Sequence, residues 1–326
     1  MSATSSPADV ASTIAALPKA ELHCHLGGVL DPEMARDLEA EGHGLGIDAA
    51  AFGACYPVSS ISDFVDVYSA FIDRFLAPRD VRLLPLVVQQ VRRWRRQNVT
   101  YAELFVSDIL LARDDLAELI ALYKLYRDTA RAEAGRGLQV ELVACVGRGP
   151  LERLARQTER ILALHDAGAI CGVSLAGLEE QPLAPAAHLL RRLRDSGMGI
   201  EIHAGETGGA DSVWDALTHG SPHRIGHGLA VFDDDRLIDA VGEAAIHLEF
   251  CPTSNLRLGC IERLADHPLL AARRHGISFS VNTDDPGAFQ CSVSSELQLV
   301  ARQFGLVEHD LMAIHANTVA AGFGRR

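Results

Sequence analysis

Residues 21–28 read Glu-Leu-His-Cys-His-Leu-Gly-Gly. The first five residues of this run predict a strand, in which His23 and His25 point to the same side because side chains alternate along a strand. Two imidazoles in this relation suit the binding of one metal ion. Hydrogen-bonded core histidines also occur in such runs, so the meaning of the pair depends on the rest of the chain.

Seven more short runs rich in apolar and β-branched residues follow, and longer amphipathic patterns, such as 116–136 and 151–167, lie between them. The predicted strands are 21–25, 100–106, 140–146, 171–176, 199–203, 224–227, 246–250 and 277–282. Eight strands alternating with helices predict an α/β fold of the TIM (β/α)8 barrel type. We expect residues 1–326 to form a single domain.

A long segment interrupts this alternation after the first strand. Residues 42–78, which extend to a Pro78-Arg79-Asp80 break, are expected to form a lid-like insertion with a helix over the pocket mouth. An ordinary packed helix is the alternative. Phe64 and Tyr68 have helical spacing and are candidate substrate contacts. Residues 1–14 are expected to be flexible.

Composition narrows the class of protein. The net charge of −13 and the pI near 5.5 disfavour binding to nucleic acid or to an anionic membrane. The seven cysteines form no C-x-x-C pair, which indicates a reducing compartment. Neither a signal peptide nor an apolar run long enough to cross a bilayer is visible, so we expect a cytoplasmic protein.

Reactive polar residues cluster at the ends of four predicted strands, where barrel enzymes carry their sites. They are His23 and His25 at the first strand, His203 and Glu206 at the fifth, His227 at the sixth, and Asp284 and Asp285 at the eighth. Imidazole and carboxylate ligands without thiolate fit zinc, while iron, manganese and cobalt stay open as alternatives.

Five segments carry a resemblance to the adenosine deaminase family that extends over nearly the whole chain. They are Pro18-Lys19-Ala20-Glu21-Leu22-His23-Cys24-His25, His203-Ala204-Gly205-Glu206, Gly226-His227-Gly228, Cys251-Pro252-Thr253-Ser254-Asn255 and Thr283-Asp284-Asp285-Pro286. The resemblance implies a zinc-containing barrel hydrolase that acts on carbon–nitrogen bonds in cyclic amidines. Such an enzyme removes the 6-amino group of an adenine ring, releases ammonia and leaves a hypoxanthine product.

The resemblance also implies roles for individual residues. The implied metal ligands are His23, His25, His203 and Asp284. A zinc ion so bound lowers the pKa of water towards about 7. His227 then stabilises the resulting hydroxide, Asp285 orients it and accepts a hydrogen bond from the purine, and Glu206 donates a proton to ring nitrogen N1. A favourable charge at a helix N-terminus is the other reading of Glu206.

Gly177, Gly27 and His25 are further candidate contacts of the substrate. The amide of Gly177 corresponds to the family group that bonds purine N3, although a turn glycine is the alternative. Gly27 stands where adenosine-specific members have an aspartate facing the ribose, and the missing carboxylate opens space. We therefore expect an adenine nucleoside with a bulkier or less polar 5′ substituent, such as 6-aminodeoxyfutalosine. Adenosine stays possible if Glu179 or a lid residue supplies the contact.

Other functions remain open at this stage. Plain adenosine or deoxyadenosine, free adenine or another amino-heterocycle could be the substrate, because the metal and acid specify the reaction better than the ring. A non-catalytic binding protein on the same fold is the remote alternative. The expected partner is a small purine compound, and the sequence does not distinguish a monomer from a homo-oligomer.

Overall fold

The computed structural model describes residues 7–43, 83–107, 111 and 113–325. Its eight parallel strands pair in sequence order into one sheet. The strands are β1 (Lys19–Glu21), β2 (Val99–Ser107), β3 (Gln139–Gly147), β4 (Gly172–Ala176), β5 (Gly199–Ala204), β6 (Arg224–His227), β7 (His247–Phe250) and β8 (Phe279–Val281). All eight overlap the strands predicted from sequence, and the predicted TIM (β/α)8 barrel is confirmed.

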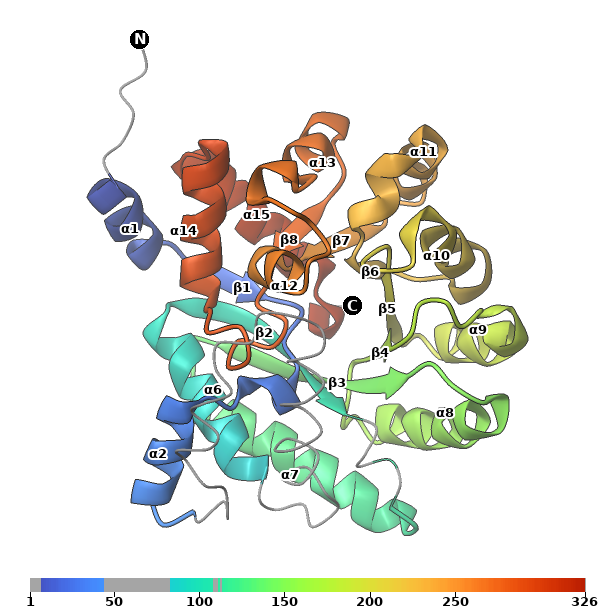
Figure 1. The fold of residues 1–326 in the computed structure, drawn as a ribbon. Helices are drawn as coiled ribbons and strands as arrows, with labels where there is room; N and C mark the ends of the chain where they lie inside the picture. The colour runs from blue at the N-terminus through green and yellow to red at the C-terminus, as the bar shows by residue number, and fades with distance from the viewer. Residues whose placement is uncertain (1–6, 44–82, 108–110, 112, 326) are drawn as a thin grey trace.

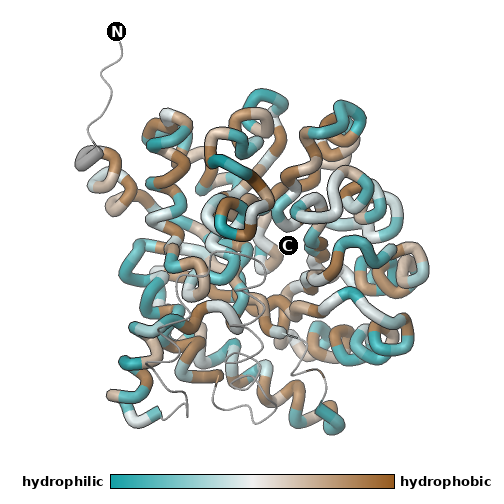
Figure 2. Tube along the Cα trace, viewed as in Figure 1, coloured by the Kyte–Doolittle hydropathy of each residue, from teal (hydrophilic) through white to brown (hydrophobic). Residues whose placement is uncertain are grey.

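The helices lie around the strands, most of them in a ring and α12 (Pro252–Arg257) inside that ring near β8 (Figure 1). They are α1 (Pro7–Ala16), α2 (Pro32–Ala40), α6 (Leu84–Arg96), α7 (Leu116–Ala134), α8 (Leu151–Asp166), α9 (Ala187–Asp195), α10 (Gly209–Asp215), α11 (Asp235–Glu243), α12 (Pro252–Arg257), α13 (Leu269–His275), α14 (Val293–Phe304) and α15 (Glu308–Ala321). Hydrophilic residues lie along outward faces of this ring, α8 among them (Figure 2). Apolar residues on the inward faces pack against the sheet, as amphipathic patterning requires.

Local sequence signals set where several helices begin. The Asp31 carboxylate accepts a hydrogen bond from Met34 N (2.7 Å), and Pro32 occupies the first turn of α2. Asp115 caps α7 in the same way, and Ser292 forms a capping box at the start of α14. Side-chain oxygens at these positions satisfy amides that have no partner within the helix. The observed bounds of α7 and α8 lie within two residues of their predicted ends.

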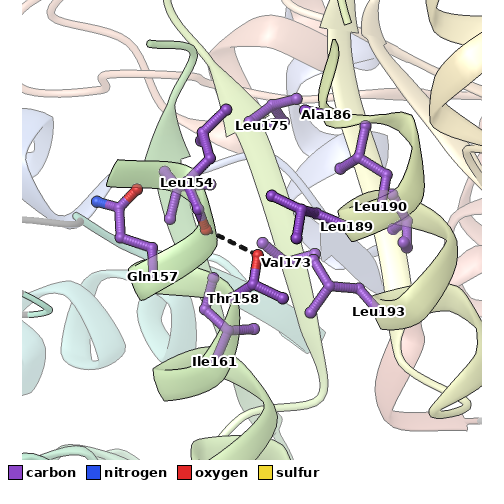
Figure 3. Close-up of a pocket in the computed structure, with 12 residues that line it drawn as sticks. Leu154, Gln157, Thr158, Ile161, Val173, Leu175, Ala186, Leu189, Leu190 and Leu193 are labelled. Carbon is purple, nitrogen blue, oxygen red and sulfur yellow. Dashed lines mark hydrogen bonds between the residues drawn. The ribbon is translucent and has the colours of Figure 1, made fainter. Parts of the chain in front are cut away.

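A small gap remains where α8 and α9 pack over β4. Leucines from both helices, including Leu154 and Leu190, face Val173 there (Figure 3). The cavity measures about 20 Å³, and the hydroxyl of Thr158 is bound to the carbonyl of Leu154 (2.8 Å). That volume holds about one water molecule, so the gap is a packing feature of the core.

The two ends of the sheet meet just beyond β1 and β8. His25 N donates to Asp284 O (2.8 Å), and Asp284 N donates to His23 O (2.9 Å), with a parallel bridge between Cys24 and Asp284. One step earlier, Leu22 N donates to the side chain of Asn282 (3.0 Å). This side-chain contact replaces a main-chain one, which explains why β1 ends at Glu21 and not, as predicted, at His25.

Two other expectations concern chain segments. The residues expected to be flexible include 7–14, which form most of α1, and Ile14 in this helix is fully buried. The expected lid, residues 42–78, lies almost wholly outside the described residues, and so do Phe64 and Tyr68.

Six cysteines in the described ranges are free thiols. No described helix combines the length and apolar character needed to cross a membrane.

Candidate active site

The closure of the barrel brings three predicted metal ligands together. His23 Nε2 lies 3.4 Å from Asp284 Oδ1, and His25 Nε2 lies 3.3 Å from the same oxygen. The two Nε2 atoms are 3.3 Å apart. Because the hydrogen bonds that join the ends of the sheet involve these same residues, the fold itself fixes their spacing.

This spacing fits a bound metal ion. Tetrahedral zinc with bonds of about 2.0–2.1 Å separates its ligand atoms by roughly 3.3 Å. His23, His25 and Asp284 offer nitrogen and oxygen atoms at that separation. The chemistry of the donors and their distances therefore suit a zinc-sized cation.

His203 and His227 extend the cluster. The ring of His203 lies 4.6 Å from that of His23 and 5.2 Å from that of His227, centroid to centroid. His23, His203 and His227 form a second group whose nitrogens could share a metal ion. His203 is thus adjacent to the first three ligands, as its predicted role requires, with its ring 5.4 Å from that of His25.

Two buried glutamates lie next to the Nδ1 atoms of His23 and His203. His23 Nδ1 donates to Glu249 Oε2 (2.7 Å), which leaves the Nε2 lone pair directed at the cluster. His203 Nδ1 lies 3.2 Å from Glu201 Oε1. Neither glutamate was found by sequence reasoning. A signal existed for Glu201, because it stands two residues before His203 and so faces the same side of β5.

The start of α12 orients two more groups. Ser254 Oγ donates to Asp284 Oδ2 (2.7 Å), and Asn255 Nδ2 lies 3.1 Å from His227 Nδ1. An amide donating to Nδ1 places the proton of a neutral His227 on Nε2, which is 3.5 Å from Glu206 Oε2. The Cys251–Asn255 segment is one of the five motifs that carry the family resemblance, but the sequence analysis predicted no role for its residues.

Backbone conformation at the site is unusual. His227 and Asp284 both adopt positive φ, +61° and +63°, which residues with a side chain rarely do. Such conformations persist where surrounding contacts enforce them and concentrate at functional sites. The Asn255 and Ser254 hydrogen bonds are among these contacts.

Burial sets the protonation of several groups. It raises the pKa of Glu206 to about 7, with a further contribution from the charge of Asp284. It lowers the pKa of His25 and of His227 to about 3, which keeps both imidazoles neutral. Burial alone would also raise the pKa of Asp284, but the hydrogen bond and charge of His23 outweigh it, so this pKa is lowered. Burial alone would lower the pKa of His23 and of His203, but hydrogen bonds with Asp284 and Glu249 outweigh it and raise the pKa of His23, and the charge of Glu201 does the same for His203.

Asp285 lies beside the cluster and is closely packed. A Cβ atom at Gly28 would fall 1.7 Å from Asp285 Oδ1, so only glycine leaves room for this carboxylate. Burial, followed by the charge of Asp284, raises the pKa of Asp285 well above its usual range. The second glycine of the Leu-Gly-Gly run thus has a steric role at the site.

One cavity of about 410 Å³ opens onto these groups. It includes eight of the predicted site residues: His25, Gly27, Gly177, His203, Glu206, His227, Asp284 and Asp285. Phe105, Cys145 and Leu258 also line it, and sequence reasoning did not name them. Gly177 has a φ of +95°, so a left-handed turn requires glycine there.

Glu179 is not available for the ribose contact considered from sequence. Its side chain is buried, and its carboxylate binds main-chain amides of residues 205–208. The alternative in which Glu179 contacts the ribose is therefore not supported, because the turn after β4 directs the side chain towards the end of β5.

Imidazoles, carboxylates and a cavity lie at the carboxyl ends of the strands of this parallel (β/α)8 barrel. Barrel enzymes have their active sites at these ends, so the fold and the site define an enzyme of this class whose site can hold a metal ion. The model of the adenosine deaminase family matches residues 18–325. The chain belongs to the adenosine deaminase family and is a hydrolase that acts on carbon–nitrogen bonds. The resemblance inferred from five motifs is confirmed.

Relatives with two different names are similar over most of the chain. The aminodeoxyfutalosine deaminase of Streptomyces avermitilis is 33% identical over 322 residues, which cover 97% of this chain and 89% of that protein. The adenine deaminase of Rhodospirillum rubrum is 34% identical over 313 residues, 94% of this chain and 92% of that protein. The crystal structure of adenine deaminase from Arthrobacter aurescens superposes with a TM-score of 0.82 at 25% identity and covers 94% of each chain.

Proposed function

We propose that this protein hydrolyses the 6-amino group of an adenine nucleoside with the help of one zinc ion. The observation that carries the proposal is a single cavity lined by Glu206 and by His25 and Asp284, two members of the His23, His25 and Asp284 cluster. Metal-ligand chemistry and a carboxylic acid with a pKa near neutrality are the two requirements of hydrolytic deamination. The reaction consumes one water, replaces the C6–amino bond with a C6–oxygen bond and releases ammonia.

The proposed division of roles follows the chemistry of each group. His23, His25, His203 and Asp284 hold the metal. When bound, zinc supplies positive charge that makes water at the site acidic enough to act as a nucleophile near neutral pH.

Three further residues act on the substrate and the attacking water. Glu206, protonated near neutral pH, donates its proton to purine N1, which removes the charge that attack at C6 would otherwise build up on the ring. His227 stabilises the attacking oxygen through its Nε2, and Asp285 orients that oxygen and forms a hydrogen bond with the purine. The amide of Gly177 donates to purine N3.

Gly27 supports a substrate with a modified 5′ position. It lines the cavity without a side chain, so it offers no carboxylate to a ribose hydroxyl. We propose a 5′-substituted adenine nucleoside such as 6-aminodeoxyfutalosine, and the name of the Streptomyces avermitilis relative is consistent with it. Free adenine is the second candidate, because other relatives of similar identity are named adenine deaminase.

A substrate panel tests the choice. The zinc-loaded protein is assayed for ammonia release from adenosine, deoxyadenosine, adenine and 5′-substituted adenine nucleosides, including 6-aminodeoxyfutalosine. We expect the highest kcat/KM for a 5′-substituted compound. Adenine as the best substrate would favour the second candidate, and adenosine as the best would contradict both.

Gly27→Asp is the matched variant for this panel. A carboxylate at position 27 is expected to raise kcat/KM for adenosine relative to the 5′-substituted compound by roughly tenfold, the worth of one charge-assisted hydrogen bond. An unchanged ratio would show that position 27 does not select the substrate.

A further inference from the structure

The carboxylate of Glu179 is bound by the loop that carries Glu206. We call residues 205–208, between β5 and α10, the Glu206 loop. Four consecutive amides of this loop and one hydroxyl donate to the two carboxylate oxygens. The donors are Gly205 N (2.8 Å), Glu206 N (3.0 Å), Thr207 N (3.4 Å), Gly208 N (2.9 Å) and Ser212 Oγ (2.6 Å).

The Glu206 loop is shaped to fit this carboxylate. Gly205 has a φ of +74°, and a Cβ atom there would lie 2.7 Å from Val213 Cγ2. A Cβ atom at Gly208 would lie 2.7 Å from Glu179 Cβ. Burial alone would raise the pKa of Glu179, but hydrogen bonds from Ser212 and the loop amides outweigh it and lower the pKa. The buried acid therefore stays ionised and accepts from all its donors.

Arg148 holds the other side of the same turn. Its guanidinium Nη1 donates to the carbonyls of Glu179 (3.0 Å) and Gln181 (3.1 Å), and Nη2 donates to the carbonyl of His203 (2.7 Å). Its amide donates to Ala176 O (2.7 Å). The Arg148 side chain is almost fully buried. The turn after β4 is thereby joined to the end of β5, where His203 lies.

These contacts link two parts of the proposed reaction. Gly177, the proposed contact of purine N3, precedes Glu179 by two residues in the same turn. Glu179 in turn binds the amide of Glu206, the proposed proton donor to N1. The turn that carries Gly177 and the loop that carries Glu206 are therefore joined by the Glu179 carboxylate.

We propose that Glu179 is a positioning residue for deamination: by binding the amides of the Glu206 loop, it holds the Glu206 carboxyl at N1 of a purine seated against Gly177. The proposal rests on the proposed function, since it assigns Glu179 an effect exerted through Glu206. It contrasts with a purely structural role, in which Glu179 stabilises the fold and affects all steps alike.

Glu179→Gln is the principal variant. The glutamine amide group would face main-chain N–H donors, so part of the Glu206 loop loses its acceptor. We expect kcat to fall about 100-fold, because a shift of about 1 Å in a catalytic group has an effect of that size. KM should change little and zinc content should stay close to wild type, while the melting temperature should fall because buried N–H donors lose their acceptor. Glu180→Gln, which alters the exposed neighbouring acid, is the matched control and should leave kcat unchanged.

A double variant separates positioning from stability. If Glu179 acts through Glu206, Glu179→Gln should cause no further loss of kcat in a Glu206→Gln background. An additive loss in the double variant would overturn the proposal, and so would wild-type kcat in Glu179→Gln.

Glu179→Asp serves if the glutamine variant does not fold. It keeps the charge one methylene further back, so kcat should lie between those of wild type and the glutamine variant or, without the latter, about tenfold below wild type. Wild-type kcat in this variant would also overturn the proposal. Failure of the proposed function looks different, because wild-type protein would then release no ammonia from any adenine compound.

Discussion

At the scale of single residues, the site depends on groups that hold the proposed ligands as much as on the ligands. Ser254 donates to the oxygen of Asp284 that faces away from His23 and His25, and Glu249 fixes the proton of His23. Partners of this kind set the direction and basicity of metal ligands. The affinity for metal should therefore respond to residues that never touch it.

Ser254→Ala tests this dependence. The variant removes the 2.7 Å hydrogen bond to Asp284 and leaves all four proposed ligands in place. We expect the affinity for zinc to fall about 10- to 100-fold, the usual effect of losing such a partner. Competition with a chelator of known affinity measures it, and wild-type affinity would show that Ser254 has no part in holding the metal.

Sequence reasoning reached the residues that carry chemistry and missed those that support them. His23, His25, His203 and Asp284 stood out by their types and their positions at strand ends, and the family resemblance proposed them as metal ligands. Glu249 was missed because its partner is 226 residues away. Glu179 was identified in the sequence, but the direction of its side chain depends on the turn after β4.

At the scale of elements, α14 and α12 are joined by a buried acid. Glu296 on α14 accepts hydrogen bonds from Thr253 N (2.9 Å) and from the Thr253 hydroxyl at the start of α12. Burial raises the pKa of Glu296 to about 7. Since α12 also carries Ser254 and Asn255, this contact supports the segment that orients Asp284 and His227.

The raised pKa predicts how stability depends on pH. Between the usual glutamate pKa of 4.5 and about 7, folded Glu296 is protonated while the unfolded chain is ionised. The folded state then binds more protons, so the free energy of unfolding falls as pH rises through this window. At about 1.4 kcal/mol per pKa unit, the contribution lost is about 3 kcal/mol.

Glu296→Gln isolates that contribution. The variant cannot ionise at position 296, so its stability relative to wild type should increase as pH rises from about 4 to about 8. Urea unfolding of both proteins across this range measures the difference. A difference that stays constant with pH would contradict the assignment.

Strand positions were predicted well because the barrel buries apolar, β-branched runs. Every predicted run overlaps an observed strand, and β6 matches at both ends. The error at β1 has a physical origin, since Leu22 N binds the Asn282 side chain and the regular pairing stops there. Such a long-range contact leaves no local pattern in the sequence.

At the scale of the whole molecule, a chain of buried charges joins the C-terminal segment to the proposed metal site. Phe323 lies over the Arg224 guanidinium, with 3.5 Å from Cζ to the ring centroid. Arg224 pairs with Glu103 (2.6 Å) and with Glu249 (2.5 Å), and Glu249 accepts from His23 (2.7 Å). Buried charges are tolerated when they are paired, and these ion pairs lead through Glu249 to His23 in the proposed metal site.

The central claim is that this barrel is a metal-dependent deaminase with Glu206 as its acid. The most direct measurement compares ammonia release from the preferred adenine compound by zinc-loaded, chelator-treated and zinc-loaded Glu206→Gln proteins. We expect one ammonia per oxopurine formed by the first, restoration by zinc after chelation, and a fall of about 10²- to 10⁴-fold in kcat for the variant. Full activity without metal, or wild-type activity in Glu206→Gln, would contradict the account.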